Sequence, residues 1–296
     1  MKKALPLPDF VGTYMQKKEQ KEQTESYEHV IKYTGLFGGV QGINLLASVL
    51  RSKLVAVLLG SSGMGLISMY NTAATFLGNA TSFGISFSAV RNIAELCEAG
   101  DRKALEDFIC VVRTWSVATA LLGFLVCILC SPLLSLSYYD TTAHWTSFLF
   151  LAPLVGLIGL YGGEMAILKG GRQLRQVAVQ SIINSLFTLL ISIPLYYIWG
   201  ESAIWASLLL VAVANLLTIL YFSCRFCPFR FSLFSRHCYV KGWEMVRLGI
   251  AFLIAGILGS GVEFLVRAFM VRIGSEADVG FYNACSWFGF ICMVNI

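Results

Sequence analysis

The chain has 296 residues, of which 57% are hydrophobic and only 13% are charged, and its mean hydropathy is +0.71. Soluble domains of this length carry more charge, whereas membrane proteins contain spans of about 20 apolar residues, so the composition is that of a membrane protein. The formal net charge of +5 gives no support to nucleic-acid binding, because the cations are dispersed between apolar runs and form no basic stripe.

Eight apolar runs follow a polar N-terminal segment. That segment, residues 1–33, includes QKKEQKEQTESYEH; we expect a cytoplasmic tail that is partly helical, and no cleavable signal peptide. Trp145 and Trp199 are expected at one membrane interface, and Trp115 and Trp243 at the other. The runs, each expected to form a transmembrane helix, are residues 34–59, 66–90, 115–136, 146–168, 177–199, 203–222, 248–273 and 279–296.

Lysine and arginine lie on alternate connections between these runs. They precede the first run and recur between the second and third, the fourth and fifth, and the sixth and seventh runs. Because basic residues beside short loops resist translocation, this alternation predicts a cytoplasmic N-terminus. The longest connections, residues 91–113 and 224–247, are then cytoplasmic, and the first is expected to be a charged helix-turn segment. No lysine or arginine lies in the connections around residues 61–63, 131–144, 200–202 and 275–278.

The first and seventh runs resemble each other. Each is glycine-rich, with Lys53 seven residues before Gly60 and Arg267 seven residues before Gly274. The run that follows each of them opens with a glycine and two apolar residues, although the alignment needs one inserted residue. The two copies are offset by six runs, an even number that preserves their orientation, so they predict two parallel lobes related by an axis along the membrane normal.

We therefore expect an all-α polytopic membrane protein with about eight transmembrane helices. A complete six-helix lobe would comprise residues 34–223, and residues 224–247 would form a cytoplasmic inter-lobe loop. Residues 248–296 would supply the first two helices of a second lobe. No lysine or arginine follows the eighth run, so we expect the second lobe to be incomplete and the chain to be C-terminally truncated.

Polar side chains form stripes on two of the predicted helices. In the first run, Gln41, Asn44, Ser48 and Arg51 are spaced by three, four and three residues, which places them on one helix sector. Polar groups that face lipid are costly, so the stripe faces protein or water. Interhelical hydrogen bonding is one interpretation, but the terminal arginine favours a hydrated cavity. The second run carries a similar stripe, whose hydroxyl groups are expected to bond between helices: Asn71, Thr75, Asn79, Ser82 and Ser86.

Cations also lie inside apolar runs. Arg51 and Lys53 are roughly 9–12 Å from the nearer helix end at a rise of 1.5 Å per residue. Being two residues apart, they cannot share a helix face; we place Arg51 in the cavity, while Lys53 either joins it or snorkels outward. In the seventh run, Glu263 and Arg267 are four residues apart, so they either neutralise each other or serve separately in ion coupling and substrate binding. Arg272 is expected to snorkel to the interface.

Several kinds of site find no support in the sequence. Nine cysteines, none in a predicted periplasmic loop, indicate no disulfide framework. The spacing of Cys224, Cys227 and the His237-Cys238 pair matches no standard zinc module, so no metal site is expected. No G-x4-G-K-[ST] phosphate loop is present, no cofactor is expected, and no residue constellation indicates an enzyme. Glu164 is expected at the cytoplasmic membrane interface rather than in a coupling site.

Two motifs carry a family resemblance, Leu59-Gly60 with Gly63-Met64-Gly65, and AVRNIAE at residues 89–95. Residues 35–95 resemble the beginning of bacterial O-antigen translocases, which are polysaccharide flippases of the multidrug/oligosaccharidyl-lipid/polysaccharide exporter superfamily. The resemblance implies two lobes around a central cationic cavity in the bacterial inner membrane. It also implies a lipid-linked oligosaccharide of the undecaprenyl-diphosphate type, carried from the cytoplasmic to the periplasmic leaflet. Membrane lipids and other polysaccharide-assembly proteins are the implied partners.

The resemblance assigns roles to the intramembrane polar residues. Arg51 and Arg267, with Lys53 as a further candidate, would neutralise the diphosphate, because arginine forks match phosphate oxygens. In the absence of an ATP site, an ion gradient or the membrane potential would drive transport, with Glu263 as the candidate for ion coupling. The amides expected to bind sugar hydroxyls are those of Gln41, Asn44 and Asn79.

Three other functions remain open at this point. A multidrug or cation exporter of the same superfamily would need an acidic cavity, whereas the charges inside the runs are mostly basic. A membrane polysaccharide polymerase or glycosyltransferase would need a sizeable loop bearing catalytic side chains, and the predicted periplasmic loops are short. A truncated chain could also act as a scaffold that transports nothing.

Overall fold

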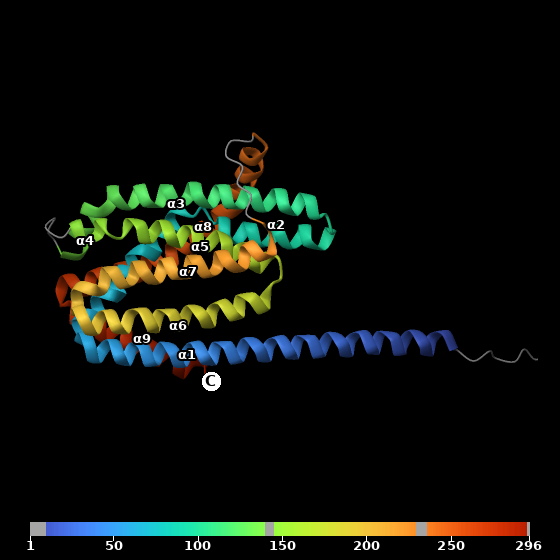
Figure 1. Ribbon diagram of the computed structural model, residues 1–296, viewed down its shortest axis with the longest axis horizontal. Helices are drawn as coiled ribbons and strands as arrows, with labels where there is room; N and C mark the ends of the chain where they lie inside the picture. Colours follow the sequence, from blue (N-terminus) through green and yellow to red (C-terminus); the bar gives the residue numbers. More distant parts are fainter. Residues whose placement is uncertain (1–9, 140–144, 229–235, 295–296) are drawn as a thin grey trace, which may run out of the picture.

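The computed structural model describes residues 10–139, 145–228 and 236–294 (Figure 1). In these ranges the chain is helical and contains no strand. Most of the helices lie side by side in one bundle, and the first part of α1 extends well beyond it. The helices are α1 (Phe10–Thr81), α2 (Ile85–Ala99), α3 (Arg102–Tyr139), α4 (Trp145–Leu149), α5 (Ala152–Gly170), α6 (Leu174–Trp199), the 3-10 helix η1 (Gly200–Ala203), α7 (Ile204–Phe226), α8 (Arg236–Ile273) and α9 (Glu276–Val294).

Helix α1 reverses its direction at Gly60. The backbone there has φ 70° and ψ −168°, a conformation that only glycine adopts without strain. Residues 10–59 therefore form a first part of α1 and residues 61–81 a second part, drawn in blue and in cyan in Figure 1. The first two predicted runs are the two arms of this hairpin.

Five helical segments in the described part of the chain are long and apolar enough to cross a membrane. Two of them contain a reversal, at Gly60 and at the η1 turn between α6 and α7. Seven of the eight predicted runs overlap these segments, and α9, the eighth, lies outside them. The chain is thus an all-α polytopic membrane protein. The segments are Gly38–Thr81, Arg102–Tyr139, Trp145–Gly170, Leu174–Phe226 and Gly242–Ile273.

The second run is shorter than its hydropathy predicts. We expected one helix to residue 90, but α1 ends at Thr81 and α2 begins at Ile85. Phe83 and Gly84 between them have φ of 49° and 64°. The reason is the close approach of α8, whose Gly249 lies against the backbone of Gly84 so tightly that neither residue has space for a Cβ atom.

The predicted cytoplasmic connections are more helical than expected. The inter-lobe loop, assigned to residues 224–247, contains the end of α7 and the beginning of α8, and the tail is part of α1 from Phe10 onward. The charged helix-turn segment at residues 91–113 is confirmed: α2 ends at Ala99, Gly100 follows it with a φ of 72°, and α3 begins at Arg102. The helices therefore extend beyond the apolar runs from which their ends were predicted.

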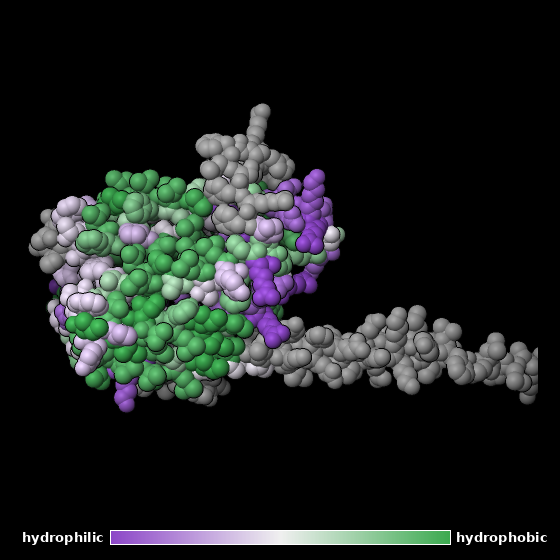
Figure 2. All heavy atoms as spheres, viewed as in Figure 1, coloured by the Kyte–Doolittle hydropathy of each residue, from purple (hydrophilic) through white to green (hydrophobic). Residues whose placement is uncertain are grey.

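The two kinds of connection lie at opposite ends of the bundle. The turns after Gly60 and Trp199 and between α8 and α9 lie at one end, called here the Gly60 end. The turns between α2 and α3 and between α5 and α6 lie at the other, called the basic end. Figure 2 shows a broad apolar band along the bundle and a cluster of hydrophilic residues at the basic end. This arrangement follows the alternation of lysine and arginine in the sequence.

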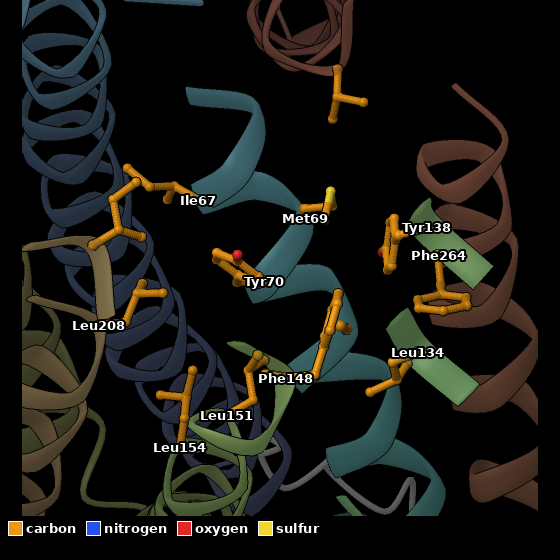
Figure 3. Packing of buried hydrophobic residues seen from close by; sticks show 14 of the residues in the cluster. Ile67, Met69, Tyr70, Leu134, Tyr138, Phe148, Leu151, Leu154, Leu208 and Phe264 are labelled. Atoms are coloured by element: carbon orange, nitrogen blue, oxygen red, sulfur yellow. The ribbon is translucent and has the colours of Figure 1, made fainter. Parts of the chain in front are cut away.

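The main core lies toward the Gly60 end and joins the two predicted lobes. Tyr138 of α3 is fully buried, stacked on Phe148 at 5.7 Å and edge-on to Phe264 of α8 at 5.1 Å (Figure 3). Tyr70, on the second part of α1, lies edge-on to Phe148 at 5.8 Å. Aromatic pairs of this kind contribute roughly 0.5–1.5 kcal/mol each beyond the burial of their area. The aromatic cluster therefore fixes α8 against α1, α3 and α4.

The two ends predict a labelling pattern. Single cysteines at Ser62 and Ser202 should react with a membrane-impermeant thiol reagent added outside intact cells, and cysteines at Lys103 and Arg172 should react only after permeabilisation. External labelling at residue 172 would contradict the predicted topology. The same pattern is expected at Thr141 and Arg230, which lie outside the described residues.

Candidate functional site: an arginine-lined cavity

A cavity of about 270 Å³ lies between the two arms of α1 and the helices α8 and α9. Both arginines predicted to bind the substrate, Arg51 and Arg267, line it, although they are far apart in the sequence. No acidic side chain lines the cavity in the described part of the chain. The other lining residues are mostly small or polar: Ser48, Ser52, Val55, Met64, Ile67, Ser68, Asn71, Thr72 and Asn283.

Arg267 is held in place from several sides. Its Nε donates a hydrogen bond to the hydroxyl oxygen of Ser68 at 3.0 Å, across from α8 to α1. One turn back along α8, Glu263 forms an ion pair with Nη1 at 3.0 Å. The ring of Tyr282 on α9 lies 5.9 Å from the guanidinium carbon, within the range of a cation–π contact. The side chain of Arg267 is 11% exposed and that of Glu263 66%, so the arginine points inward while the carboxylate lies at the surface.

Arg51 has no hydrogen-bond or ion-pair partner among the described residues. It is partly buried, and it reaches the cavity from the helix turn after Ser48. A charge at this depth in a membrane protein needs water or an anion, because an uncompensated arginine at the centre of a span costs about 2.5–3.5 kcal/mol on insertion scales. The cavity therefore offers one guanidinium that is pre-oriented and one that is available to bind an anion.

The remaining predicted site residues lie elsewhere. The amide of Asn44 is satisfied by α6: its nitrogen donates to Ser181 at 2.7 Å, and its oxygen accepts from Ser185 at 2.6 Å. Gln41 and Lys53 are exposed, and neither lines the cavity. Hydrogen bonding between helices thus accounts for one member of the first stripe, whereas two others, Ser48 and Arg51, do line the cavity.

The second stripe does not bond between helices as expected: the hydroxyl groups of Thr75 and Ser82 donate to carbonyl oxygens of their own helix, those of Asn71 at 2.7 Å and Asn79 at 3.0 Å. Asn79 lies beside Gly256 of α8, nearer the basic end than the cavity, while Asn71 lines the cavity. Sequence reasoning missed Ser68, three residues before Asn71 of the second stripe, and Asn283, three residues before Ser286. The available signal was the repeat itself, because Ser68 and Asn283 each lie three residues after the aligned glycines Gly65 and Gly280.

The comparisons with known proteins define the family. A family model described as polysaccharide biosynthesis protein matches residues 30–291, which include almost the whole described bundle. The chain belongs to the polysaccharide biosynthesis protein family. No curated protein and no solved structure gives a match.

This member of the polysaccharide biosynthesis protein family contains a second charged cluster, near the basic end, that is fully buried. Arg113 of α3 pairs with Glu164 of α5, Nε to Oε1 at 3.0 Å, and the two side chains are 2% and 7% exposed. Ser223 of α7 accepts from Arg113 at 3.1 Å and donates to the same carboxylate. The guanidinium also donates to the carbonyl oxygens of Cys227 and Pro228, at 3.3 and 3.0 Å.

The expectation that Glu164 lies at the cytoplasmic membrane interface did not include its burial between α3, α5 and α7. Glu164 is buried because Arg113 and Ser223 satisfy both of its oxygens, which offsets the desolvation of the charge. The sequence contained Arg113 among the basic residues of a connection, and nothing in the spacing relates it to a carboxylate 51 positions later. The cluster joins α3, α5 and α7, and its hydrogen bonds to Cys227 and Pro228 hold the backbone just after the end of α7.

Removing one partner of this cluster should destabilise the protein. Glu164→Ala leaves a buried guanidinium without its carboxylate, and such changes cost about 3–5 kcal/mol. We expect a clear fall in the Tm of the purified protein in detergent. The double variant Glu164→Met with Arg113→Met should recover most of it, because no charge remains buried. Glu95→Ala, which removes an exposed i,i+4 partner of Arg91, is the control and should change Tm little.

Proposed function

We propose that this protein is a flippase that carries a lipid-diphosphate-linked oligosaccharide from the cytoplasmic to the periplasmic leaflet of the bacterial inner membrane. The observation that carries the proposal is the convergence of Arg51 and Arg267 on one cavity whose described lining contains no carboxylate. Membership of the polysaccharide biosynthesis protein family supports the same substrate class. The Gly60 end then faces the periplasm and the basic end the cytoplasm.

The physical problem in this reaction is the head group. A sugar diphosphate is large, polar and anionic, and the apolar bilayer core rejects it. An arginine 4 Å from a phosphate charge gains about 4 kcal/mol at an effective dielectric constant of 20, and the planar guanidinium matches two phosphate oxygens at once. Asn71 and Asn283 supply neutral amide groups to the same cavity for the neighbouring sugar, and Ser48, whose hydroxyl donates to the carbonyl oxygen of Leu45, can accept a hydrogen bond there. The lipid tail stays in the bilayer, so the cavity need hold only the polar part.

The charge of the lining also separates this function from cation export. A cationic drug would meet two guanidinium groups in the cavity, which raises its electrostatic energy instead of lowering it. An anionic substrate gains from both. The proposal therefore keeps Arg51 and Arg267 as the diphosphate ligands and leaves Gln41, Asn44, Asn79 and Lys53 as outer candidates that a moving substrate would contact.

Transport by alternating access needs a source of free energy, and we propose an ion gradient acting through Glu263. Its carboxylate is largely exposed on α8 and bound to Arg267, so protonation or ion binding there changes the charge next to a substrate ligand. Glu263 is thus placed to link an ion to the affinity of the cavity for its anion. The alternative is that Glu263 only neutralises Arg267.

The role of Arg51 can be tested by substitution in cells that depend on the protein for surface polysaccharide. Arg51→Lys keeps the charge and should retain partial export, whereas Arg51→Gln should lose most of it, because the diphosphate then loses a cation. Lys53→Gln removes a nearby cation of the same helix that lies outside the cavity, and should lose less export than Arg51→Gln. Arg91→Gln, at an exposed cation of α2 far from the cavity, is the control and should export at or near the normal level. Near-normal export by both Arg51 variants would mean that this side chain does not contact the substrate.

The role of Glu263 is separated from simple pairing by a double variant. If the pair is only structural, Arg267→Gln alone should lower expression and the double variant with Glu263→Gln should restore both expression and export. We expect instead that the double variant accumulates normally in the membrane and remains inactive. Export is measured as surface polysaccharide, and accumulation by immunoblot of membranes. Recovery of export would remove both residues from the mechanism.

A further inference from the structure

The crossing of the second part of α1 with α9 has a reciprocal geometry. A Cβ atom added at Gly65 would overlap the carbonyl oxygen of Glu276, and one added at Gly280 would overlap the carbonyl oxygen of Ser61. Ser61 lies as far before Gly65 as Glu276 lies before Gly280, so each helix presents its glycine to the same position of the other. Such exchange is the sign of a local two-fold axis.

This crossing lies directly outside the arginine-lined cavity. Met64, one residue before Gly65, lines the cavity, and Ser68 and Asn283 line it about one helical turn further from the Gly60 end. Two backbones in direct contact leave no gap for a ligand to pass. The glycine crossing therefore leaves no opening between the second part of α1 and α9 on the Gly60 side of the cavity.

A hydrogen bond fastens the same crossing to α3. The hydroxyl of Tyr139, the last residue of α3, donates to Oε1 of Glu276, the first residue of α9, at 2.6 Å. A bond to a carboxylate is worth more than a neutral one, typically by a factor of about two.

We propose that Tyr139 and Glu276 are the latch of an outer gate, in which the Ser61–Gly65 and Glu276–Gly280 crossing is the seal. The inference rests on the proposed function only in assuming that the cavity opens toward the periplasm. Opening at the Gly60 end requires the two glycines to separate and the Tyr139–Glu276 hydrogen bond to break. Both residues therefore set the equilibrium between closed and open states without contacting the anion, and act as positioning residues.

The test follows access to the cavity instead of export. A cysteine at Ser48, a lining residue, is exposed to a membrane-impermeant thiol reagent outside intact cells, and its modification is read from the peptide mass, so that the natural cysteines can stay. In the parent the seal keeps this reaction slow. Tyr139→Phe removes the latch and should raise the labelling rate about tenfold, the change in open population expected from one lost hydrogen bond to a charged group.

Companion variants make the result specific. Glu276→Gln retains an acceptor oxygen for Tyr139 and should give a smaller increase, while Gly280→Ala inserts a methyl into the seal and should give an increase at least as large as Tyr139→Phe. Ser137→Ala is the control, since among the described residues its exposed hydroxyl donates within α3, to the carbonyl oxygen of Leu133. A rate for Tyr139→Phe equal to that of Ser137→Ala, in protein of unchanged Tm, would overturn the proposal.

The labelling distinguishes this proposal from the proposed function. The labelling needs no substrate. If the Arg51 variants exported normally, the flippase proposal would fail, but the labelling result for the gate would still stand. Conversely, an unchanged labelling rate would exclude Tyr139 and Glu276 as a latch, and the proposal that the arginine-lined cavity binds an anion would not be affected. Anion affinity, measured with inorganic pyrophosphate on the purified protein, should differ less than twofold between Tyr139→Phe and the control.

Discussion

The structure depends on one constraint, the cost of holding a guanidinium away from bulk water. Three arginines meet it in different ways. Arg113 is neutralised by Glu164 and by carbonyl oxygens at the end of α7, and it is almost completely buried. Arg267 forms an ion pair with the exposed carboxylate of Glu263 and donates a hydrogen bond to the hydroxyl oxygen of Ser68. Arg51 has no acidic partner in the described chain. The degree of compensation falls from the basic end toward the cavity, and the capacity to bind an anion rises accordingly.

This gradient divides the molecule into a fixed and a responsive part. Around Arg113, three helices are tied by one buried network, and breaking any of its bonds exposes a charge to an apolar interior. Around the cavity, the walls come from the two arms of α1 and from α8 and α9. The polar contacts between these walls are few, and the ion pair of Arg267 is partly solvated. A change in the relative position of the walls therefore costs less free energy than a change around Arg113.

Most of the long helices and the two arginines of the cavity could be predicted from the sequence, because both depend on residues that are close together in the chain. Apolar runs give the spans, alternating cations give the two ends, and spacing of three and four residues places Arg51 on a polar sector. It was insufficient where distant parts of the chain decide the outcome. The break at Gly84 exists because Gly249 approaches it, and Glu164 is buried because Arg113 reaches it from another helix. Asn44 likewise satisfies its amide on α6, which no spacing along α1 indicates.

The glycine contact between Ser61–Gly65 and Glu276–Gly280 also has a consequence for divergence within the family. A seal made of backbone atoms tolerates almost no replacement at its two glycines, since any Cβ meets a carbonyl oxygen. The side chains one turn inward, such as Ser68 and Asn283, touch the cavity and not the seal. Exchange of the cavity side chains can therefore change the shape and polarity of the cavity without disturbing the contact between the two helices.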